Sequence, residues 1–356
     1  MSSIGIQLGD RRDIFIETSV NPLATHSIAT LTDALALYDL YSRVDPTLSL
    51  SAITKMLESI SSTPLYSLER GLDSVRTLFQ GLTATLTPVD NREAYYQNLL
   101  SFRASLPLGP VSPYRIVSVV GTEQTAASLA KNQSTEGLAY RYALQELNPF
   151  AVLGVDYGQH NVGGALDLYD AQTGQGTMTA LYLADRADLL AEKNKYGLTD
   201  GTPANRSPTL YEDQLTGFTN ERGATATEVV IFGDFEGRAL VGRSGNDHLY
   251  GGGGNDTLTG GAGQDYLEGG SDDDTLDGGS ESDILLGQQG TDTLKGGTGN
   301  DRLNGGLGDD RLEGGTGSDH YTYVLGQGHD TIQDSDQLGS IRFGGSVLVG
   351  GFRHNA

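Results

Sequence analysis

The chain has 356 residues, a formal net charge of −23 and no cysteine. The acidic excess argues against nucleic acid as a partner, because phosphate backbones are bound chiefly by Lys and Arg side chains. Without cysteine, a disulfide framework is excluded. No apolar run approaches the roughly 18 residues that a membrane span requires, and the N-terminal segment MSSIGIQLGDRRDIFIE lacks an apolar stretch. We therefore expect neither a transmembrane span nor a cleavable signal peptide.

Residues 1–200 show the hydrophobic periodicity of α-helices. Helices are predicted near 31–44, 51–60, 67–82, 92–102, 136–147 and 177–195. Prolines such as Pro64 and Pro88 mark boundaries between them, because proline cannot donate a backbone hydrogen bond. A segment of this length can bury a core of its own. We therefore predict a mainly helical domain over 1–200, then a turn-rich linker and cap strand over 201–232.

Nine copies of a nine-residue repeat follow one another without a break from Gly242 to Thr322. The consensus of the copies is G-G-x-G-x-D-x-U-x, where U is a large apolar residue. The sixth position is always aspartate: Asp247, Asp256, Asp265, Asp274, Asp283, Asp292, Asp301, Asp310 and Asp319. The eighth position is leucine in every copy except the last, which has Tyr321. Paired glycines permit a tight turn, so the first six residues of a copy predict a turn and the last three a short strand.

The repeat predicts a right-handed parallel β-roll, in which two copies make one coil and the leucines point inward. Turns 18 residues apart then stack in two columns. One column holds Asp247, Asp265, Asp283, Asp301 and Asp319, and the other holds Asp256, Asp274, Asp292 and Asp310. Adjacent strands lie about 4.8 Å apart, so these carboxylates can coexist only with a cation between successive turns. Hard oxygen ligands are what calcium selects, and four and three gaps in the two columns predict up to about seven ions.

This repeat resembles the RTX (repeats-in-toxin) calcium-binding family. The resemblance implies that backbone carbonyls at the second and fourth positions join the aspartates as ligands. The glycines concerned are Gly252, Gly254, Gly261, Gly263, Gly297, Gly299, Gly306 and Gly308. A chain without cysteine fits this interpretation, because metal ions take the stabilising role that disulfides have in many extracellular proteins.

Three consecutive copies depart from the pattern. Asp272 and Glu281 replace the fourth-position glycine, and Gln288 replaces the second-position glycine. Either these middle sites are distorted or the acids supply extra carboxylate ligands, and the sequence leaves both interpretations open. Residues 233–241 form a tenth copy in register, but Arg238 stands in place of the aspartate. We expect this copy to be a cap without a calcium ligand.

A segment rich in glycine and aspartate is usually a disordered acidic linker. From Gly242 to Thr322 there are 16 acidic residues against 4 basic residues, a net charge of −12. The strict phase between leucine and aspartate favours an ordered roll when calcium is present. Without calcium, a small leucine core does not offset charge repulsion and the entropy of the glycines. Folding of the repeats is therefore predicted to be coupled to metal binding.

The family resemblance also implies a route out of the cell. RTX proteins leave Gram-negative bacteria through a type I secretion channel, guided by an uncleaved C-terminal signal, and fold in external calcium. This implies an extracellular location and the type I machinery as a partner. The stretch GQGHDTIQD resembles the closing segment of such blocks, so the roll is predicted over 233–334. The 34 residues from Tyr323 to Ala356 are short for a cap plus a signal, so we expect a chain that is cut within its post-repeat segment, 335–356.

The upstream runs IFIETSVNPLATHSIATLTDALALYDLY, YRYALQELNPFAVLG and GALDLYD resemble the region between a lipase-like α/β-hydrolase domain and the RTX block of large secreted proteins. In that layout His26 stands where a triad histidine follows the last hydrolase strand. A helix N-cap or surface histidine is the other interpretation. No G-x-S-x-G nucleophile motif occurs, so we predict no catalytic residue and no enzyme activity for this chain. An active secreted lipase or esterase that uses His26 is the alternative.

A further alternative is an adhesin-type structural roll, which would present a regular threonine ladder on one outward face. The seventh positions are His248, Thr257, Tyr266, Thr275, Ile284, Thr293, Arg302, Arg311 and His320, which is too irregular for such a ladder. The sequence thus predicts an α+β multi-domain fold: an N-terminal all-α domain followed by a calcium-binding β-roll.

Overall fold

The computed structural model describes residues 2–7, 13–18, 24–61, 68–81, 91–106, 111–197, 209–220, 226–343 and 346–349. Contacts divide the chain into two compact units. The helical unit comprises Met1–His160 and Asn194–Asp200, and the roll unit comprises Asn161–Lys193 and Gly201–Ala356. The domain boundaries stated above stay a prediction. The division by contacts places Asn161–Lys193, which precedes the turn-rich segment, with the repeats.

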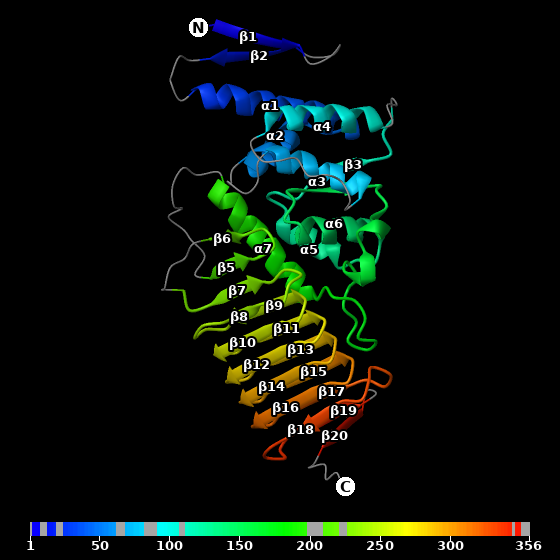
Figure 1. The fold of residues 1–356 in the computed structure, drawn as a ribbon, viewed down its shortest axis with the longest axis vertical. Helices are drawn as coiled ribbons and strands as arrows, with labels where there is room; N and C mark the ends of the chain where they lie inside the picture. Colours follow the sequence, from blue (N-terminus) through cyan, green and yellow to red (C-terminus); the bar gives the residue numbers. More distant parts are fainter. Residues whose placement is uncertain are drawn as a thin grey trace. The chain divides into compact units, whose positions relative to one another are not determined.

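The helical unit consists mainly of helices (Figure 1). Its elements are β1 (Ser2–Gln7), β2 (Asp13–Thr18), α1 (Ala24–Val44), α2 (Leu50–Ser61), α3 (Leu68–Gln80), α4 (Arg92–Ser105), β3 (Arg115–Ser118), α5 (Glu123–Ala130), α6 (Thr135–Gln145) and β4 (Phe150–Leu153). The helices predicted from periodicity are confirmed as α1 to α4 and α6. Helix α5 and the antiparallel pair β3–β4 were not predicted, because such short segments contain too few apolar positions to show a period.

The core of the helical unit joins α1 to segments distant in sequence. Tyr41 is fully buried and donates a hydrogen bond from its hydroxyl to the carbonyl oxygen of Gly71, 3.2 Å away. Its ring meets that of Phe150 edge-on at 5.4 Å between centroids. At the end of α1, the buried Asp45 carboxylate accepts a hydrogen bond from the backbone N–H of Ile116 at 2.8 Å. These contacts attach the antiparallel pair β3–β4 to the helices.

The roll unit contains most of helix α7 (Ala180–Gly197) and strands β5 to β20. The strands are β5 (Leu210–Asp213), β6 (Phe218–Thr219), β7 (Val229–Phe232), β8 (Ala239–Val241), β9 (His248–Gly253), β10 (Thr257–Ala262), β11 (Tyr266–Ser271), β12 (Thr275–Ser280), β13 (Ile284–Gln289), β14 (Thr293–Thr298), β15 (Arg302–Leu307), β16 (Arg311–Thr316), β17 (His320–Tyr323), β18 (Thr331–Gln333), β19 (Ser340–Phe343) and β20 (Ser346–Val349). Strand β7 lies at the end of the segment 201–232, in which a cap strand was predicted.

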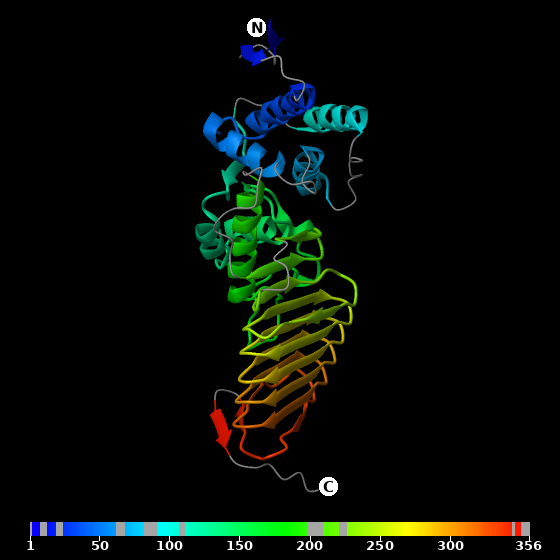
Figure 2. The same cartoon turned by 90° about the vertical axis from the view of Figure 1, so that its left-hand side faces the viewer.

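Successive repeats alternate between two sheets, and the coils stack along one axis (Figures 1 and 2). One sheet has six strands in the order β18-β16-β14-β12-β10-β8, and the other has ten in the order β20-β19-β17-β15-β13-β11-β9-β7-β5-β6. Neighbouring strands of the repeats are parallel, with each residue opposite the one 18 positions away, as Leu249 is opposite Leu267. The predicted parallel β-roll with two repeats per coil is confirmed.

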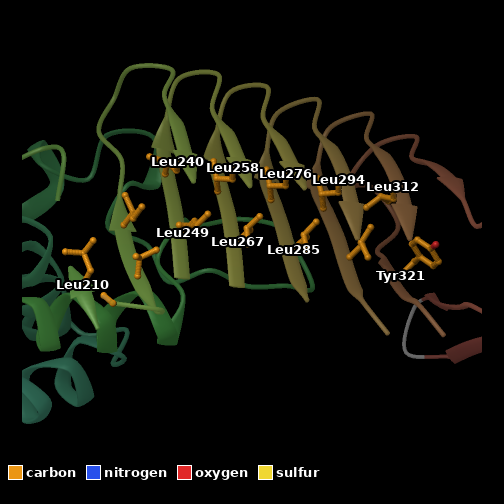
Figure 3. Close-up of a cluster of buried hydrophobic side chains, with 14 residues drawn as sticks. Leu210, Leu240, Leu249, Leu258, Leu267, Leu276, Leu285, Leu294, Leu312 and Tyr321 are labelled. Carbon is orange, nitrogen blue, oxygen red and sulfur yellow. The ribbon is translucent and has the colours of Figure 1, made fainter. Parts of the chain in front are cut away.

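The eighth-position side chains fill the space between the two sheets. Figure 3 shows Leu240, Leu258, Leu276, Leu294 and Leu312 in one row, facing a second row that contains Leu249, Leu267 and Leu285. Each of these leucines is at most 1% exposed. The strand periodicity places every second side chain inside, so a single large residue per copy is enough to close the core.

The strands are longer than the sequence predicted. A typical one, β10, runs through positions seven to nine of one copy and on through the first three positions of the next. The expectation that all six leading residues form a turn is therefore wrong. Glycines at the first two positions still join the parallel ladder, as Gly261 does opposite Gly279, so the turn is confined to positions four to six.

The outward faces of the two sheets differ, because alternate copies belong to different sheets. On the six-stranded sheet the seventh position carries Thr257, Thr275 and Thr293 in register, followed by Arg311. The nine seventh-position side chains therefore form two separate columns, one on each sheet, and not a single face. The ninth position on this sheet carries Asp277, Lys295 and Glu313, so the face is interrupted by charge. No helix in the described part of the chain is long and apolar enough to cross a membrane.

Candidate calcium sites

The sixth-position aspartates stand in two columns, as the 18-residue spacing predicts. Within each column the Oδ1 atom of an aspartate accepts a hydrogen bond from the backbone N–H of the residue 18 positions earlier. The N···Oδ1 distances run from 2.8 Å, between Asp256 and Asp274, to 3.1 Å, between Asp301 and Asp319. Each carboxylate therefore links its own turn to the turn before it.

The other carboxylate oxygen, Oδ2, is buried and has no hydrogen-bond partner among the described residues in eight of the nine aspartates. These are Asp256, Asp265, Asp274, Asp283, Asp292, Asp301, Asp310 and Asp319. Asp247 differs, because its Oδ2 accepts a hydrogen bond from the backbone N–H of Arg243 at 2.5 Å. A buried and unpaired carboxylate oxygen is costly. These oxygens therefore require a proton or a cation as a partner.

Backbone carbonyls of the second and fourth positions point along the roll axis toward the next coil. A Cβ atom built on Gly261 would come 2.7 Å from the carbonyl oxygen of Arg243, at the second position of the preceding coil. At the fourth position, a Cβ on Gly263 would collide with the carbonyl oxygen of Gly245. The same contact recurs along the roll, for example between Gly308 and the carbonyl of Gly290. At these glycines the carbonyl oxygen of the preceding coil occupies the space that a side chain would need.

Three of the four departures from the glycine pattern keep the positive φ angle of the glycines that they replace; the fourth is Arg243, at the second position of the first copy. Asp272, Glu281 and Gln288 have φ angles of 74°, 80° and 76°, in the left-handed region that the equivalent glycines occupy. The turns are therefore not rearranged. Asp272 also accepts a hydrogen bond through Oδ2 from the backbone N–H of Gly254 at 3.1 Å, which ties it to the preceding coil. The amide of Gln288 turns away from the turn and donates to the Glu268 carboxylate at 3.1 Å.

The tenth copy joins the column through its backbone alone. The backbone N–H of Arg238 donates to Oδ1 of Asp256 at 2.6 Å, like the aspartates of the following copies. Its guanidinium turns outward, where Nη2 lies 2.6 Å from Oδ2 of Asp234. The copy thus continues the stack without adding a carboxylate to it, which is the arrangement of the expected cap.

Asp330 continues the column that ends at Asp310 beyond the nine copies, and it was not among the predicted ligands. Its Oδ1 accepts a hydrogen bond from the backbone N–H of Asp310 at 3.3 Å, across a spacing of 20 residues instead of 18. Strand β18 then pairs with β16, with Ile332 opposite Leu312. The signal was present in GQGHDTIQD, where the spacing G-x-G-x-D-x-I matches positions two to eight of the repeat.

The columns hold the aspartates in an environment that favours their neutral form. Burial raises the pKa of Asp256, Asp265, Asp301 and Asp310 to about 6, of Asp283 and Asp292 to about 7, and of Asp274 to about 8. The hydrogen bond from the backbone N–H lowers each pKa, and neighbouring carboxylates raise it further. A divalent cation would remove this cost by replacing the proton.

The donor set suits calcium. In the described part of the chain, no group of three or more His, Cys, Asp or Glu side chains could hold a metal ion. A site between coils must therefore combine a few carboxylate oxygens with backbone carbonyls. Calcium accepts about six to eight such oxygen ligands in flexible geometry, whereas zinc prefers four nitrogen or sulfur ligands. The unpaired Oδ2 atoms and the axial carbonyls fit the first description.

Stacked coils with a leucine core and two columns of aspartate define a parallel β-solenoid of the metal-binding type. The profile of one family, the RTX calcium-binding nonapeptide repeat, matches residues 239–267, 251–285, 259–294 and 286–321. This segment is therefore a calcium-binding RTX β-roll of the haemolysin type, and the resemblance found in the sequence is confirmed for it. No curated protein matches the chain. The match covers the repeats and gives no support to the lipase-like resemblance upstream.

The weak catalytic candidate lies in the helical unit. His26 belongs to the first turn of α1, and its side chain lies outside the described residues. Its two interpretations, a triad histidine or an N-cap or surface histidine, stay predictions.

Proposed function

We propose that the sixth-position aspartates hold calcium between successive coils, together with second- and fourth-position carbonyls, and that this binding drives folding of the roll. The observation that carries the proposal is the row of buried Oδ2 atoms without hydrogen-bond partners among the described residues. The ligands proposed are the nine aspartates from Asp247 to Asp319 and the carbonyls of the glycines named above. Up to about seven ions would then occupy the four and three gaps.

Far-UV circular dichroism during a calcium titration of the purified chain tests this proposal. We expect a cooperative gain of β signal at roughly 10⁻⁴ to 10⁻³ M calcium, the range of extracellular calcium modules. EDTA should reverse the gain. Magnesium is the matched control, because it demands octahedral geometry and releases its water reluctantly. A full β signal in EDTA at neutral pH would contradict the proposal.

We further propose that the chain works outside a Gram-negative cell after export through a type I channel. RTX repeats are typical of secreted proteins, and a segment with a net charge of −12 would stay unfolded at low cytosolic calcium and fold outside. The test is to express the chain with and without a type I system in a host that otherwise lacks one. Accumulation in the medium only with the system supports the proposal, and accumulation without it contradicts it.

The alternative function, a secreted lipase or esterase with His26 in a triad, is tested by hydrolysis of a p-nitrophenyl ester. The chain contains no G-x-S-x-G motif, so we expect no hydrolysis above background. Calcium-dependent hydrolysis that is lost in His26→Ala would favour the alternative instead.

A further inference from the structure

Residues Asn161–Lys193, which we term the strap, extend along the ten-stranded sheet and contact its coils in succession. Toward the C-terminal end of the strap, Nη1 of Arg186 lies 3.0 Å from Oδ1 of Asp213 in β5. The guanidinium of Arg186 also lies 4.7 Å from the ring centre of Phe232 in β7. Both charged side chains are almost fully buried. Toward the N-terminal end of the strap, the hydroxyl of Tyr169 accepts a hydrogen bond from Nδ2 of Asn304 in β15 at 3.0 Å.

Strand β9 is joined to the strap by Asp185. Its Oδ2 accepts a hydrogen bond from the hydroxyl of Tyr250 and lies beside Nδ1 of His248, each at 2.6 Å. Both partners belong to β9. Tyr182, on the same helix α7, adds an edge-on contact with the ring of Tyr250 at 5.2 Å between centroids. One strand of the roll therefore receives a charged and an aromatic contact from the strap.

The centre of the strap is held by Glu268, which projects from β11. The side chain is 3% exposed. Its Oε1 accepts hydrogen bonds from Thr179 Oγ1 at 2.5 Å and from the Tyr266 hydroxyl at 2.6 Å, and its Oε2 accepts one from Gln288 Nε2 at 3.1 Å. Gln288 also reaches the carbonyl oxygen of Thr177 in the strap at 3.3 Å. Gln288, which replaces a second-position glycine of the repeat, therefore forms hydrogen bonds both to the strap and to Glu268.

The polar residues that meet the strap share one position of the repeat. Tyr250, Glu268 and Asn304 are all ninth-position residues of the ten-stranded sheet, spaced by 18 or by 36 residues. They lie in line only when the coils are stacked in register. On the six-stranded sheet the ninth position carries Asp277 and Lys295, which are partly exposed and pair with each other at 3.4 Å. The buried ninth-position side chains are therefore particular to the sheet that the strap covers.

We propose that the strap is a calcium-dependent brace: it docks on the ten-stranded sheet only after calcium has stacked the coils. The proposal rests on the calcium-coupled folding argued above. In a chain with unfolded repeats, the three ninth-position partners are separated by flexible glycine-rich turns and offer no continuous surface. Docking then requires the ordering that calcium supplies.

Hydrogen exchange measured by mass spectrometry on the full chain tests the brace. Peptides from 166–186 report the strap, and peptides from 248–271 report the roll. With saturating calcium we expect both groups to be protected at least about tenfold relative to EDTA. Unprotected roll peptides in calcium, or roll peptides equally protected in EDTA, would overturn the proposed function. Roll peptides that respond to calcium while strap peptides do not would overturn the brace alone.

Glu268→Ala separates docking from calcium binding. We expect strap protection in calcium to fall by at least about tenfold, while the calcium-induced β signal persists, because Glu268 is not a sixth-position ligand. Glu313→Ala is the matched control, since Glu313 has the same repeat position in the six-stranded sheet and pairs with Arg311 at 3.6 Å. The control should leave strap exchange unchanged. Equal strap protection in Glu268→Ala and the wild-type chain would overturn the brace.

Thr179→Val keeps the test decisive if Glu268→Ala prevents folding of the roll. This substitution lies outside the repeats and removes the hydroxyl that donates to Glu268. The same hydroxyl accepts a hydrogen bond from the backbone N–H of Tyr182 at the start of α7, so exchange before residue 179 reports docking, whereas exchange after it also reports the helix cap. We expect faster exchange in 166–186 with no change in 248–271. Unchanged strap exchange in this variant would count against the brace, whatever the fate of the other variant.

Discussion

At the scale of single residues, each repeat aspartate has two different tasks. Oδ1 binds the backbone N–H of the preceding coil, whereas Oδ2 is left without a hydrogen-bond partner in eight of the nine described carboxylates. The neutral amide of asparagine could still accept the backbone hydrogen bond through its oxygen. It could not supply the negative charge that binding of a divalent cation requires.

We therefore expect Asp274→Asn to weaken calcium binding more than it weakens the coil. Asp274 has the highest pKa that can be assigned to the columns, about 8, because burial and its neighbours Asp292 and Asp256 oppose its charge. The midpoint of the calcium titration should rise on the order of tenfold, and isothermal titration should count fewer ions. Asp277→Asn, a partly exposed acid on the outer face, is the control. Equal midpoints for the two variants would contradict the ligand role.

Glycine at the fourth position is predicted to be required for more than its φ angle. Gly263 has φ of 120° and stands where a Cβ would collide with the Gly245 carbonyl, whereas Gly326 has φ of 94° with no atom within 4 Å. Gly326→Ala should cost about 1–2 kcal/mol, the strain of a left-handed residue. Gly263→Ala should cost more and should raise the calcium midpoint as well. Thermal melting in calcium compares them, and equal losses would mean that only φ matters.

At the scale of elements, the two columns behave as a line of coupled acids. A carboxyl whose pKa is raised on folding binds protons more tightly in the folded state, so folding is favoured by acid and penalised as the pH rises through that pKa. The pKa of an aspartate in the unfolded chain is about 3.9, whereas burial raises the pKa of the column aspartates from Asp256 to Asp310 to between about 6 and 8. Calcium and protons therefore compete for the same oxygens.

The pH dependence should consequently have opposite signs with and without calcium. In EDTA we expect more β signal at pH 5 than at pH 8, because the protonated columns no longer repel. In calcium we expect the binding midpoint to fall as the pH rises from 6 to 8, because fewer protons must be displaced. Circular dichroism at each pH measures both. A midpoint independent of pH over this range would show that the raised pKa values do not belong to the ligands.

At the scale of the whole molecule, the roll is a one-dimensional stack in which each coil contacts only its neighbours. Each coil contributes one large residue from each sheet to the core, so a gap in the middle separates the coils on either side. Leu285 is fully buried in the central part of this core, while Leu240 lies on β8, the edge strand of the six-stranded sheet.

Leu285→Ala should accordingly reduce cooperativity, not only stability. Removing a buried leucine costs about 2–5 kcal/mol. In the middle of the stack the loss should split the calcium-induced transition into two, or make it visibly less steep. Leu240→Ala, on the edge strand of the six-stranded sheet, should lower the melting temperature while keeping one steep transition. Calcium titrations of both variants by circular dichroism provide the measurement, and two equally steep curves would contradict a nearest-neighbour stack.

The sequence predicted the roll, its 18-residue coil and the two aspartate columns, because the period of the repeat determines all three. The helices of the first 200 residues were also largely predictable from their apolar spacing. The strap was not, since Thr179 and Asp185 follow no motif and their partners Glu268 and Gln288 read only as departures from a repeat. The continuation at Asp330 was hidden by two extra residues in the spacing. Single contacts between distant segments leave no period in a sequence.

The alternation of copies between the two sheets also sets how such a chain can grow. Gain or loss of two adjacent copies would add or remove a complete coil and leave every later side chain on its own sheet. Gain or loss of one copy would transfer all later outward-facing residues to the opposite sheet, where Asn304 could no longer face Tyr169. A pair of nonapeptides is therefore the smallest segment that can be added or removed without moving later residues to the other sheet, although the sequence repeats after one nonapeptide.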